Sequence, residues 1–382
     1  MNFDLHHEEL VLTNSLKQKI IDKIGRDSIS FSQYMELALY EKDYGYYNNL
    51  LHKFGEAGDF ITAPMVSKVF SECIAKQLRE LFEHIPNNRN ILEIGAGNGQ
   101  MMLDLILLLN DDISCYFVLE LSANLISLQK SFISEKAPHL LTKIVWLDSL
   151  PTNFDGVILA NEVLDAQPCD VIVWDNGKIN ERVISVDSNN NLLYKEVPLQ
   201  SPELLDIAKK INLNTDCYTS EISLNNRGFI KSLAQSLSSG FILLIDYGHS
   251  ESEYYSLAKA KGTLRGFFRH QLLDDILVYP GLIDITTSVD FTSIAITAID
   301  NGLDFIGYTT QAGFLLNCGM IELLDLWHQK LSDKEYLRLT SQVNYLTSPN
   351  EMGEVFKVIG FSRGIDVAHW MGFTNNDRSY TL

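Results

Sequence analysis

The chain has 382 residues and a formal net charge of −19, with 30 Lys and Arg against 49 Asp and Glu. Hydrophobic residues make up 46% of the sequence and charged residues 21%, a composition typical of soluble globular proteins. The acidic balance argues against DNA or RNA as a partner, because phosphate binding needs a basic face, and no apolar run reaches the ~18 residues that a membrane helix needs.

The N-terminal residues show no features of a targeting segment. They lack a basic start followed by an apolar core, and they hold too much acid and no early Arg for a mitochondrial transit peptide. We therefore expect a cytoplasmic location. The five cysteines and nine histidines show no disulfide or metal-ligand spacing and no CxxC pair. We expect neither a disulfide framework nor a metal site.

Helical spacing of apolar residues marks three segments near the N-terminus, at residues 8–24, 31–42 and 68–82. Ser30 or Ser32 is placed to cap the second of these helices. The second and third helices are separated by a loop rich in Gly, Tyr and Asn, with the sequence DYGYYNNLLHKFGEAGDFITAPMVS. This pattern predicts a helical extension before the main fold.

From residue 90 the pattern changes to short apolar strands that alternate with helices. Strands are predicted at 90–94, 116–121, 143–147, 156–160 and 240–245, and helices at 100–109, 124–134 and 222–238. Such alternation implies right-handed crossovers and a parallel sheet. Two more strands, at 303–310 and 354–361, flank a helix-rich stretch and are predicted to form an antiparallel pair at one edge.

Two segments interrupt this alternation. Residues 171–197 hold Asn176-Gly177 and the run SNNN between apolar stretches, which is typical of antiparallel hairpins. Residues 249–290 show no regular pattern. The predicted fold class is α/β, a doubly wound, mostly parallel seven-stranded sheet with an N-terminal helical extension and an antiparallel β insertion. The predicted domains are 1–85 and 86–382, the second with insertions at about 168–221 and 249–300.

A glycine-rich turn, EIGAGNG, follows the first of these strands. Gly95, Gly97 and Gly99 permit positive φ angles and let backbone N–H groups at a helix N-terminus approach a ligand. The NAD fingerprint GxGxxG requires glycine at position 100, where the sequence has Gln100. The acid before the turn, Glu93, favours instead S-adenosylmethionine (SAM), whose sulfonium and amino groups are cationic.

Two further acids lie in register with this turn. Glu120 stands 23 residues after Gly97, at the end of the second predicted strand, where a carboxylate binds ribose hydroxyls in nucleotide-binding folds. Asp148 follows the third predicted strand, where a polar residue lies near the adenine. An ordinary solvated strand end is the open alternative for both residues.

The fourth predicted strand ends in a polar cluster, ANEVLDAQP (160–168). Asn161, Glu162 and Asp165 stand at the carboxyl edge of the sheet, where substrate and cofactor meet in open α/β folds. Two carboxylates there can bind a guanidinium in line with a methyl donor. The alternative is that they are acids at a helix N-terminus, where the helix macrodipole stabilises negative charge. His270, in GTLRGFFRH, is a candidate proton carrier, with a structural, hydrogen-bonded histidine as the alternative.

Motifs along most of the chain resemble the MidA family of SAM-dependent methyltransferases. The motifs are GEAGDFITAP (55–64), LEIGAGNGQMMLDLI (92–106), ANEVLDAQP (160–168), LLIDYG (243–248), GTLRGFFRH (262–270), GLIDITTSVDF (281–291), YTTQAGFLLNCG (308–319) and SPNEMGEVFKV (348–358). The resemblance implies a class I methyltransferase fold, SAM as cofactor and a protein arginine as acceptor. The family includes a methyltransferase of mitochondrial complex I assembly, so a role in respiratory complex assembly is also implied.

The resemblance also implies roles for individual residues. The cofactor turn of the family corresponds to Glu93, Gly95, Gly97 and Gly99, and its ribose-binding acid corresponds to Glu120. The segment over the cofactor pocket corresponds to Gly58, Asp59, Thr62 and Pro64. The motif beside the transferred methyl corresponds to Asn161, Glu162 and Asp165. Two positions depart from the family pattern, with Ala96 in place of a frequent Pro and Met65 in place of a common Glu. The second departure bears on substrate contacts near this segment.

Three functions are therefore open. The first is a protein arginine N-methyltransferase in which Glu162, helped by Asp165, holds the guanidinium. The second is a SAM-dependent methyltransferase of a small molecule or another side chain, and the third is a non-catalytic assembly factor that retains the fold. The partners expected are an arginine-bearing protein and a second copy of the chain in a homodimer, without nucleic acid and without a membrane span.

Overall fold

The computed structural model describes residues 5–49, 51, 62–85, 88–213, 215–269, 271–366 and 369–382. The chain forms two compact units, each discontinuous in sequence. Unit 1 comprises Met1–Phe60, Leu164–Gly228 and Glu251–Ser288, and unit 2 comprises Ile61–Val163, Phe229–Ser250 and Val289–Leu382. Among the described residues, no helix combines the length and the apolar character needed to cross a membrane.

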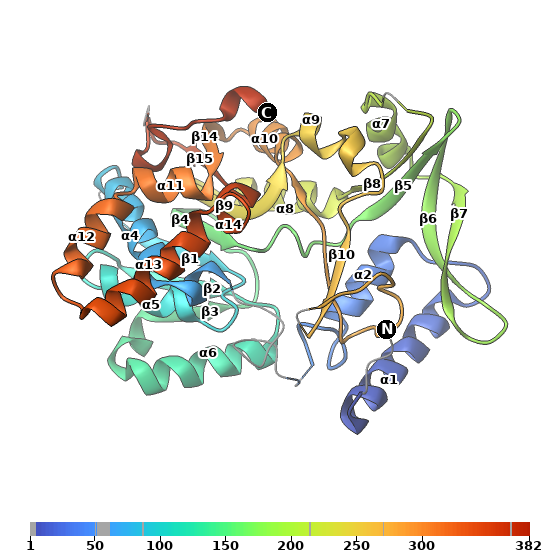
Figure 1. Cartoon of the computed structure of the whole chain (residues 1–382), viewed down its shortest axis with the longest axis horizontal. Helices are drawn as coiled ribbons and strands as arrows, with labels where there is room; N and C mark the ends of the chain where they lie inside the picture. The colour runs from blue at the N-terminus through green and yellow to red at the C-terminus, as the bar shows by residue number, and fades with distance from the viewer. Residues whose placement is uncertain are drawn as a thin grey trace. The chain divides into compact units, whose positions relative to one another are not determined.

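Unit 2 contains an eight-stranded sheet. Its strands are β1 (Asn90–Ile94), β2 (Cys115–Leu119), β3 (Ile144–Leu147), β4 (Phe154–Asn161), β9 (Leu237–His249), β13 (Val289–Asp290), β14 (Asp304–Thr310) and β15 (Phe356–Arg363). The spatial order is β14-β15-β9-β4-β1-β2-β3, the order in which the labels run from top to bottom in Figure 1, with β13 paired to β9. Strands β3 to β9 in this order are parallel, and β15 is antiparallel to both of its neighbours. The predicted doubly wound, mostly parallel sheet and its antiparallel edge pair are confirmed.

The central strands are apolar because both faces of the sheet are covered. Strands β4 and β9 bury nearly continuous runs of Val, Ile, Leu and Phe. Gly156 and Gly240 lie opposite each other where these two strands begin to pair. A Cβ atom on Gly240 would lie 1.9 Å from the carbonyl oxygen of Gly156, so only glycine permits this approach.

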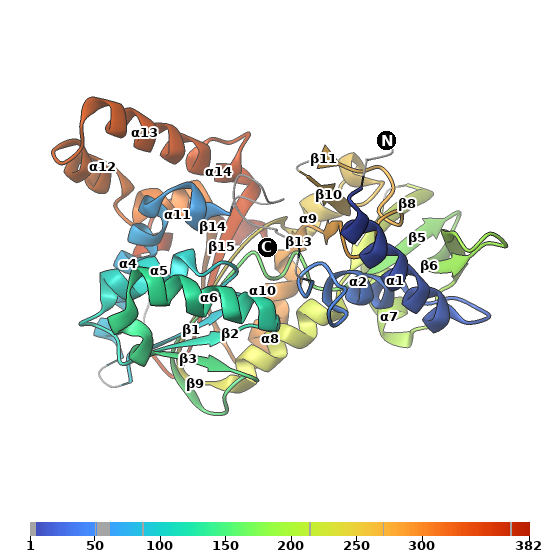
Figure 2. The same ribbon diagram turned by 90° about the horizontal axis from the view of Figure 1, so that it is seen from below.

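Unit 2 also contains helices, several of which share one apolar core with the sheet. They are α3 (Ala63–Val66), α4 (Lys68–Glu83), α5 (Gln100–Leu109), α6 (Ala123–Lys136), α10 (Phe291–Asp300), α11 (Gln311–Asn317), α12 (Met320–His328), α13 (Asp333–Thr347) and α14 (Met352–Val355), with the 3₁₀ helices Pro138–Lys143, Met371–Phe373 and Ser379–Thr381. The core joins apolar residues of α4, α5, α11 and α13 to those of β1, β4 and β9. Figure 2 shows α12 and α13 as a helical pair that follows α11.

Unit 1 contains two smaller antiparallel sheets. The first has the order β7-β6-β5-β8 and the second β11-β10-β12. Their strands are β5 (Asp170–Asp175), β6 (Lys178–Val186), β7 (Leu192–Pro198), β8 (Cys217–Ile222), β10 (Arg265–Phe268), β11 (Gln271–Leu272) and β12 (Asp284–Thr286). The predicted antiparallel insertion is confirmed, whereas the expectation that residues 249–290 are irregular is wrong.

The hairpin between β5 and β6 turns at the predicted position. Asn176 and Gly177 have φ angles of 47° and 78°, and a two-residue hairpin turn requires positive φ at both positions when it is of type I′. Helices α1 (His7–Ile24) and α2 (Phe31–Tyr40) pack against β6, as Figure 2 shows for α1. Ser30 caps α2: its Oγ accepts from the Gln33 N–H at 3.2 Å, and the Gln33 side chain accepts from the Ser30 N–H.

The remaining helices belong to unit 1 or span the boundary. They are α7 (Pro202–Lys210), α8 (Leu224–Ser236), α9 (Glu251–Tyr254) and the 3₁₀ helix Leu257–Lys259. The sequence passes from unit 1 to unit 2 within α8. The helix predicted to begin at Ile222 begins at Leu224 instead, because Ile222 still pairs with Asp170 in β8.

Candidate functional site

The glycine turn links β1 to α5 at the carboxyl edge of the sheet in unit 2. Gly95, Gly97 and Gly99 have φ angles of 68°, 54° and 85°, all in the left-handed region that favours glycine. A Cβ atom on Gly95 would lie 3.0 Å from Cγ2 of Val163, so the turn lies beside the residues that follow β4. The N–H groups of Gly95 and Gly99 donate to the carbonyls of Leu119 at 2.9 Å and Ala96 at 2.8 Å, so these bonds fix the shape of the turn that leads into α5.

Glu93 lies in β1 beneath this turn, with 2% of its surface exposed. The hydroxyl of Tyr116 donates a 2.7 Å hydrogen bond to its Oε2. Burial raises the pKa of Glu93 to about 7; the bond from Tyr116 lowers that pKa, and Glu120 and Asp104 add smaller raising effects. The carboxyl group therefore titrates near neutral pH, and a cation bound at the turn would favour its charged form.

Glu120 directly follows β2 and is tied to the glycine turn through Gln129. Its two carboxylate oxygens accept from the Ser122 N–H at 3.1 Å and from Nε2 of Gln129 at 3.3 Å. The same Nε2 donates to the Gly97 carbonyl at 2.9 Å, and Oε1 of Gln129 accepts from the Trp146 indole at 2.9 Å. Sequence reasoning missed Gln129, because a single glutamine within a helix belongs to no recognisable motif.

We expect Gln129→Met to weaken SAM binding roughly tenfold, because Gly97 and Glu120 lose a shared donor worth about 1 kcal/mol per hydrogen bond. Calorimetric titration with SAM measures the change. Gln77→Met is the matched control, since Gln77 is also a fully buried helical glutamine of unit 2 but bonds Glu80 and Gly372 instead. Equal losses in the two variants would show that the effect is one of general packing.

The residues after β4 form a strained turn. Glu162 has a φ angle of 56°, which is uncommon for a residue with a side chain. Its N–H donates to the Ile245 carbonyl at 2.9 Å, and the N–H of Val163 donates to Oδ2 of Asp246 at 3.1 Å. The Asn161 amide donates to Oε1 of Glu162 at 2.9 Å. Strained backbone of this kind is concentrated at functional sites, where the surrounding structure holds it.

Two features mark this turn as a place for a polar ligand. The amide oxygen of Asn161 is buried and has no hydrogen-bond partner among the described residues. Buried acceptors are normally satisfied, so a ligand N–H is a natural partner for it. Tyr345 of α13 lies within reach of the charge on Glu162: burial raises the pKa of this phenol, and the carboxylates of Glu351 and Glu162 raise it further.

Asp165, which the sequence groups with Glu162, belongs to unit 1 and is 6% exposed. It lies in an acidic-aromatic cluster formed with Asp284, Tyr40 and Tyr47. The Tyr47 hydroxyl donates to Oδ1 of Asp284 at 2.8 Å, and its ring stacks on Tyr40 with 5.5 Å between centroids. Burial raises the pKa of Tyr47 well above its ordinary value, and the charges of Asp284 and Asp165 also raise it.

The other predicted residues are distributed as follows. Asp148 is exposed and follows β3. Thr62 precedes α3 and Pro64 is buried within it, and α3 packs against α5, the helix that follows the glycine turn. Gly58, Asp59 and His270 lie outside the described residues, so their roles stay predictions. Within the described ranges, no three His, Cys, Asp or Glu side chains are grouped as metal ligands would be.

Comparison with protein families and solved structures identifies close similarities. Residues 73–309 match the model of a family described as "Putative S-adenosyl-L-methionine-dependent methyltransferase". The chain is similar to a crystal structure from Burkholderia thailandensis with S-adenosyl-homocysteine bound, at 32% identity, a TM-score of 0.93 and 100% coverage of both chains. A native crystal structure from the same organism has 32% identity, a TM-score of 0.91 and the same coverage.

Curated relatives extend over most of the chain. One is "Protein arginine methyltransferase NDUFAF7, mitochondrial" from Xenopus tropicalis, 28% identical over 92% of this chain and 86% of the relative. Its homologue from Caenorhabditis elegans is 28% identical over 90% of this chain and 85% of the relative. Both are named as mitochondrial proteins, which contradicts the cytoplasmic location expected above. That expectation rested on the composition of the N-terminal residues alone.

Proposed function

Because the chain belongs to the MidA family of SAM-dependent methyltransferases, we propose that it methylates the guanidinium of an arginine in a protein partner. Methyl transfer and the SAM cofactor follow from the family itself. S-adenosyl-homocysteine, bound in the similar structure, is what SAM becomes after its methyl group has left. The arginine acceptor is supported by the relatives that are named protein arginine methyltransferases.

The strained turn at Glu162 is the observation that carries this proposal. It lies at the carboxyl edge of the sheet, and Val163 places it beside Gly95 of the glycine turn. A carboxylate at this position binds a guanidinium through charge-assisted hydrogen bonds and orients it toward the methyl donor. The guanidinium nitrogen attacks the methyl carbon, the C–S electron pair returns to sulfur, and Glu162 favours loss of the nitrogen's proton.

The acidic composition of the chain is compatible with a cationic acceptor, because a carboxylate pairs with the planar guanidinium of arginine. The net charge of −19 favours the approach of a basic partner in the same way. Asp165 is 6% exposed, and its role in binding the acceptor stays a proposal. We also propose a role in respiratory complex assembly. A further proposal is that the chain forms a homodimer, which sedimentation velocity tests.

The decisive test compares wild type with Glu162→Gln after incubation with isotopically labelled SAM and lysate from the source organism. We expect labelled methylarginine in a protein from the wild-type reaction, and a loss on the order of 100-fold in the variant, since the aligning and proton-accepting carboxylate is gone. SAM affinity should stay unchanged. Glu351→Gln is the control, because this exposed carboxylate also faces Tyr345 but lies outside the turn.

Two outcomes would overturn the proposal. Wild-type transfer by Glu162→Gln with SAM still bound would remove Glu162 from the reaction. If the label accumulates in metabolites, or on a protein side chain other than arginine, the proposed arginine acceptor is wrong. The methyltransferase activity itself would still stand.

A further inference from the structure

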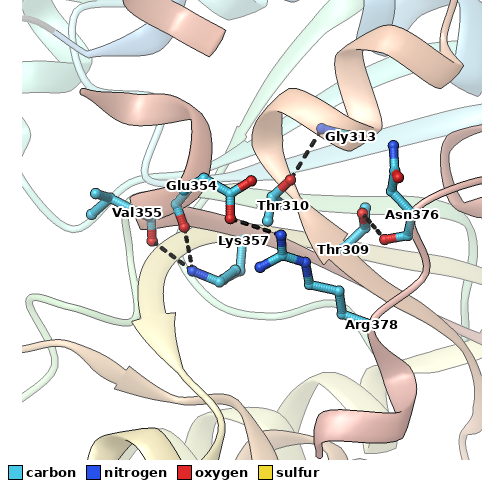
Figure 3. Close-up of polar contacts among 8 residues, drawn as sticks. All are labelled: Thr309, Thr310, Gly313, Glu354, Val355, Lys357, Asn376 and Arg378. Carbon is cyan, nitrogen blue, oxygen red and sulfur yellow. Dashed lines mark hydrogen bonds and ion pairs between the residues drawn. The ribbon is translucent and has the colours of Figure 1, made fainter. Parts of the chain in front are cut away.

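Lys357 is a buried lysine at the carboxyl edge of the unit 2 sheet. It is the second residue of β15 and is 5% exposed. Its Nζ donates to the carbonyl oxygens of Glu354 and Val355, the latter at 3.2 Å (Figure 3). Removing an ammonium from water is energetically costly unless other groups in the protein compensate its charge. The reaction proposed above gives this charge no role.

The strand register places Lys357 directly opposite Asp246 of β9. Residues opposed in an antiparallel pair point to the same face of the sheet, with Cβ atoms about 4.5–5.5 Å apart. Asp246 is 1% exposed, and its two oxygens accept from the N–H groups of Val163 at 3.1 Å and Tyr247 at 2.9 Å. A buried carboxylate and a buried ammonium on one face compensate each other's charge.

Asp246 in turn holds the strained turn of the site. The bond from the Val163 N–H fixes the residue after Glu162, and the bond from the Glu162 N–H to Ile245 fixes Glu162 itself. A residue in a sparsely populated conformation stays there only while the surrounding contacts over-determine it. Weakening the Asp246 bond therefore releases one of two backbone contacts that keep Glu162 at a φ angle of 56°.

We propose that Lys357 is a positioning residue of the methyl-transfer site, which maintains the charge on Asp246 and thereby the turn at Glu162 and Val163. Without the ammonium, Asp246 either keeps a buried charge that is less well compensated or takes up a proton, and both outcomes disturb its bond to the Val163 N–H. The consequence for methyl transfer rests on the proposed role of Glu162, whereas the consequence for the turn does not.

A purely structural role for Lys357 makes a different prediction. Its contacts with Glu354 and Val355 cap the last turn of α14, and α14 is also held by an ion pair of 2.8 Å between Glu354 and Arg378 (Figure 3). The same figure shows that Thr309 bonds the C-terminal segment through the Asn376 carbonyl. Arg378→Gln thus loosens α14 without touching Asp246, which makes it the matched control.

Hydrogen exchange of the full chain, followed by mass spectrometry, reads the turn directly. We expect the Val163 amide to exchange on the order of tenfold faster in Lys357→Met, at the wild-type rate in Lys357→Arg, and at the wild-type rate in Arg378→Gln. Unchanged exchange in Lys357→Met, or an equal acceleration in Arg378→Gln, would overturn the proposal.

A double-mutant comparison keeps the test decisive if Lys357→Met folds poorly. If Lys357 acts through Asp246, exchange at Val163 in Asp246→Asn should be accelerated as in Lys357→Met, and Lys357→Met should add nothing further in the Asp246→Asn background. Additive effects of substitutions at the two positions would contradict the proposed coupling. Circular dichroism and SAM titration confirm that each variant is folded.

The rate of methyl transfer supplies the second readout. Under saturating labelled SAM, Lys357→Met should lower kcat on the order of tenfold, and Lys357→Arg should restore it. If Glu162→Gln transfers at the wild-type rate while Lys357→Met still accelerates exchange at Val163, the proposed function fails and the positioning of the turn stands. If exchange at Val163 is unchanged in Lys357→Met and Glu162→Gln is inactive, the positioning role of Lys357 fails and the proposed function stands.

Discussion

Gly95→Ala should weaken SAM binding on the order of 100-fold, or about 3 kcal/mol. The φ angle of 68° costs an alanine roughly 1–2 kcal/mol, and the added Cβ atom would lie 3.0 Å from Cγ2 of Val163. The turn relieves this crowding by moving away from its wild-type conformation, in which the Gly95 N–H bonds the Leu119 carbonyl at 2.9 Å. SAM must then restore that conformation when it binds, so the strain appears as lost affinity.

Gly177→Ala provides the control for backbone strain alone. Gly177 has a φ angle of 78° and lies in the β5–β6 hairpin of unit 1, where an added Cβ atom would meet no heavy atom within 4 Å. We expect this variant to lose stability but to bind SAM as the wild type does in calorimetric titration. Binding by Gly95→Ala within about threefold of the wild-type affinity would contradict the assignment of the turn as the SAM cradle.

The fold could be predicted wherever its signal is local. Buried strands that alternate with amphipathic helices leave periodic patterns, and these predicted the sheet of unit 2 and its antiparallel edge pair. Residues 249–290 leave no such pattern, because β10, β11 and β12 have only four, two and three residues. Strands so short depend on partners distant in sequence, as in the pairing of Arg265 with Thr286.

The site divides in the same way. The places of the glycine turn, Glu93 and Glu120 at the ends of β1 and β2 could be predicted, because a motif holds each at a fixed distance in the sequence, whereas their contacts with SAM stay predictions. Gln129 and Asp246 act through hydrogen bonds to Gly97 and Val163, residues that are 32 and 83 positions away. No local pattern records such contacts. Glu162 and Asp165 are three residues apart and fall on either side of the boundary between the units, and their joint role stays a prediction.

Glu93 should make both stability and SAM affinity depend on pH near neutrality. Its folded pKa of about 7 lies above the ordinary value of 4.5, so the neutral carboxyl group favours the folded state. This contribution to the free energy of unfolding is fully present below pH 4.5 and is lost as the pH rises through 7. It amounts to about 3 kcal/mol, because the two pKa values differ by about 2.5 units. Glu93→Gln, which stays neutral, should therefore be more stable than wild type at pH 8 and nearly equal to it at pH 4.5.

SAM binding should follow the opposite trend, because the cationic cofactor favours the charged carboxylate of Glu93. With a pKa of about 7, the charged fraction rises about tenfold between pH 6 and pH 8, and affinity should rise with it. Glu93→Gln should flatten this profile in calorimetric titrations. Glu221→Gln is the control, since burial also raises the pKa of Glu221 but this carboxyl belongs to unit 1 and accepts hydrogen bonds from Thr263. A pH-dependent rise that persists in Glu93→Gln would assign the titration to another group and leave Glu93 with only a packing role beneath the turn.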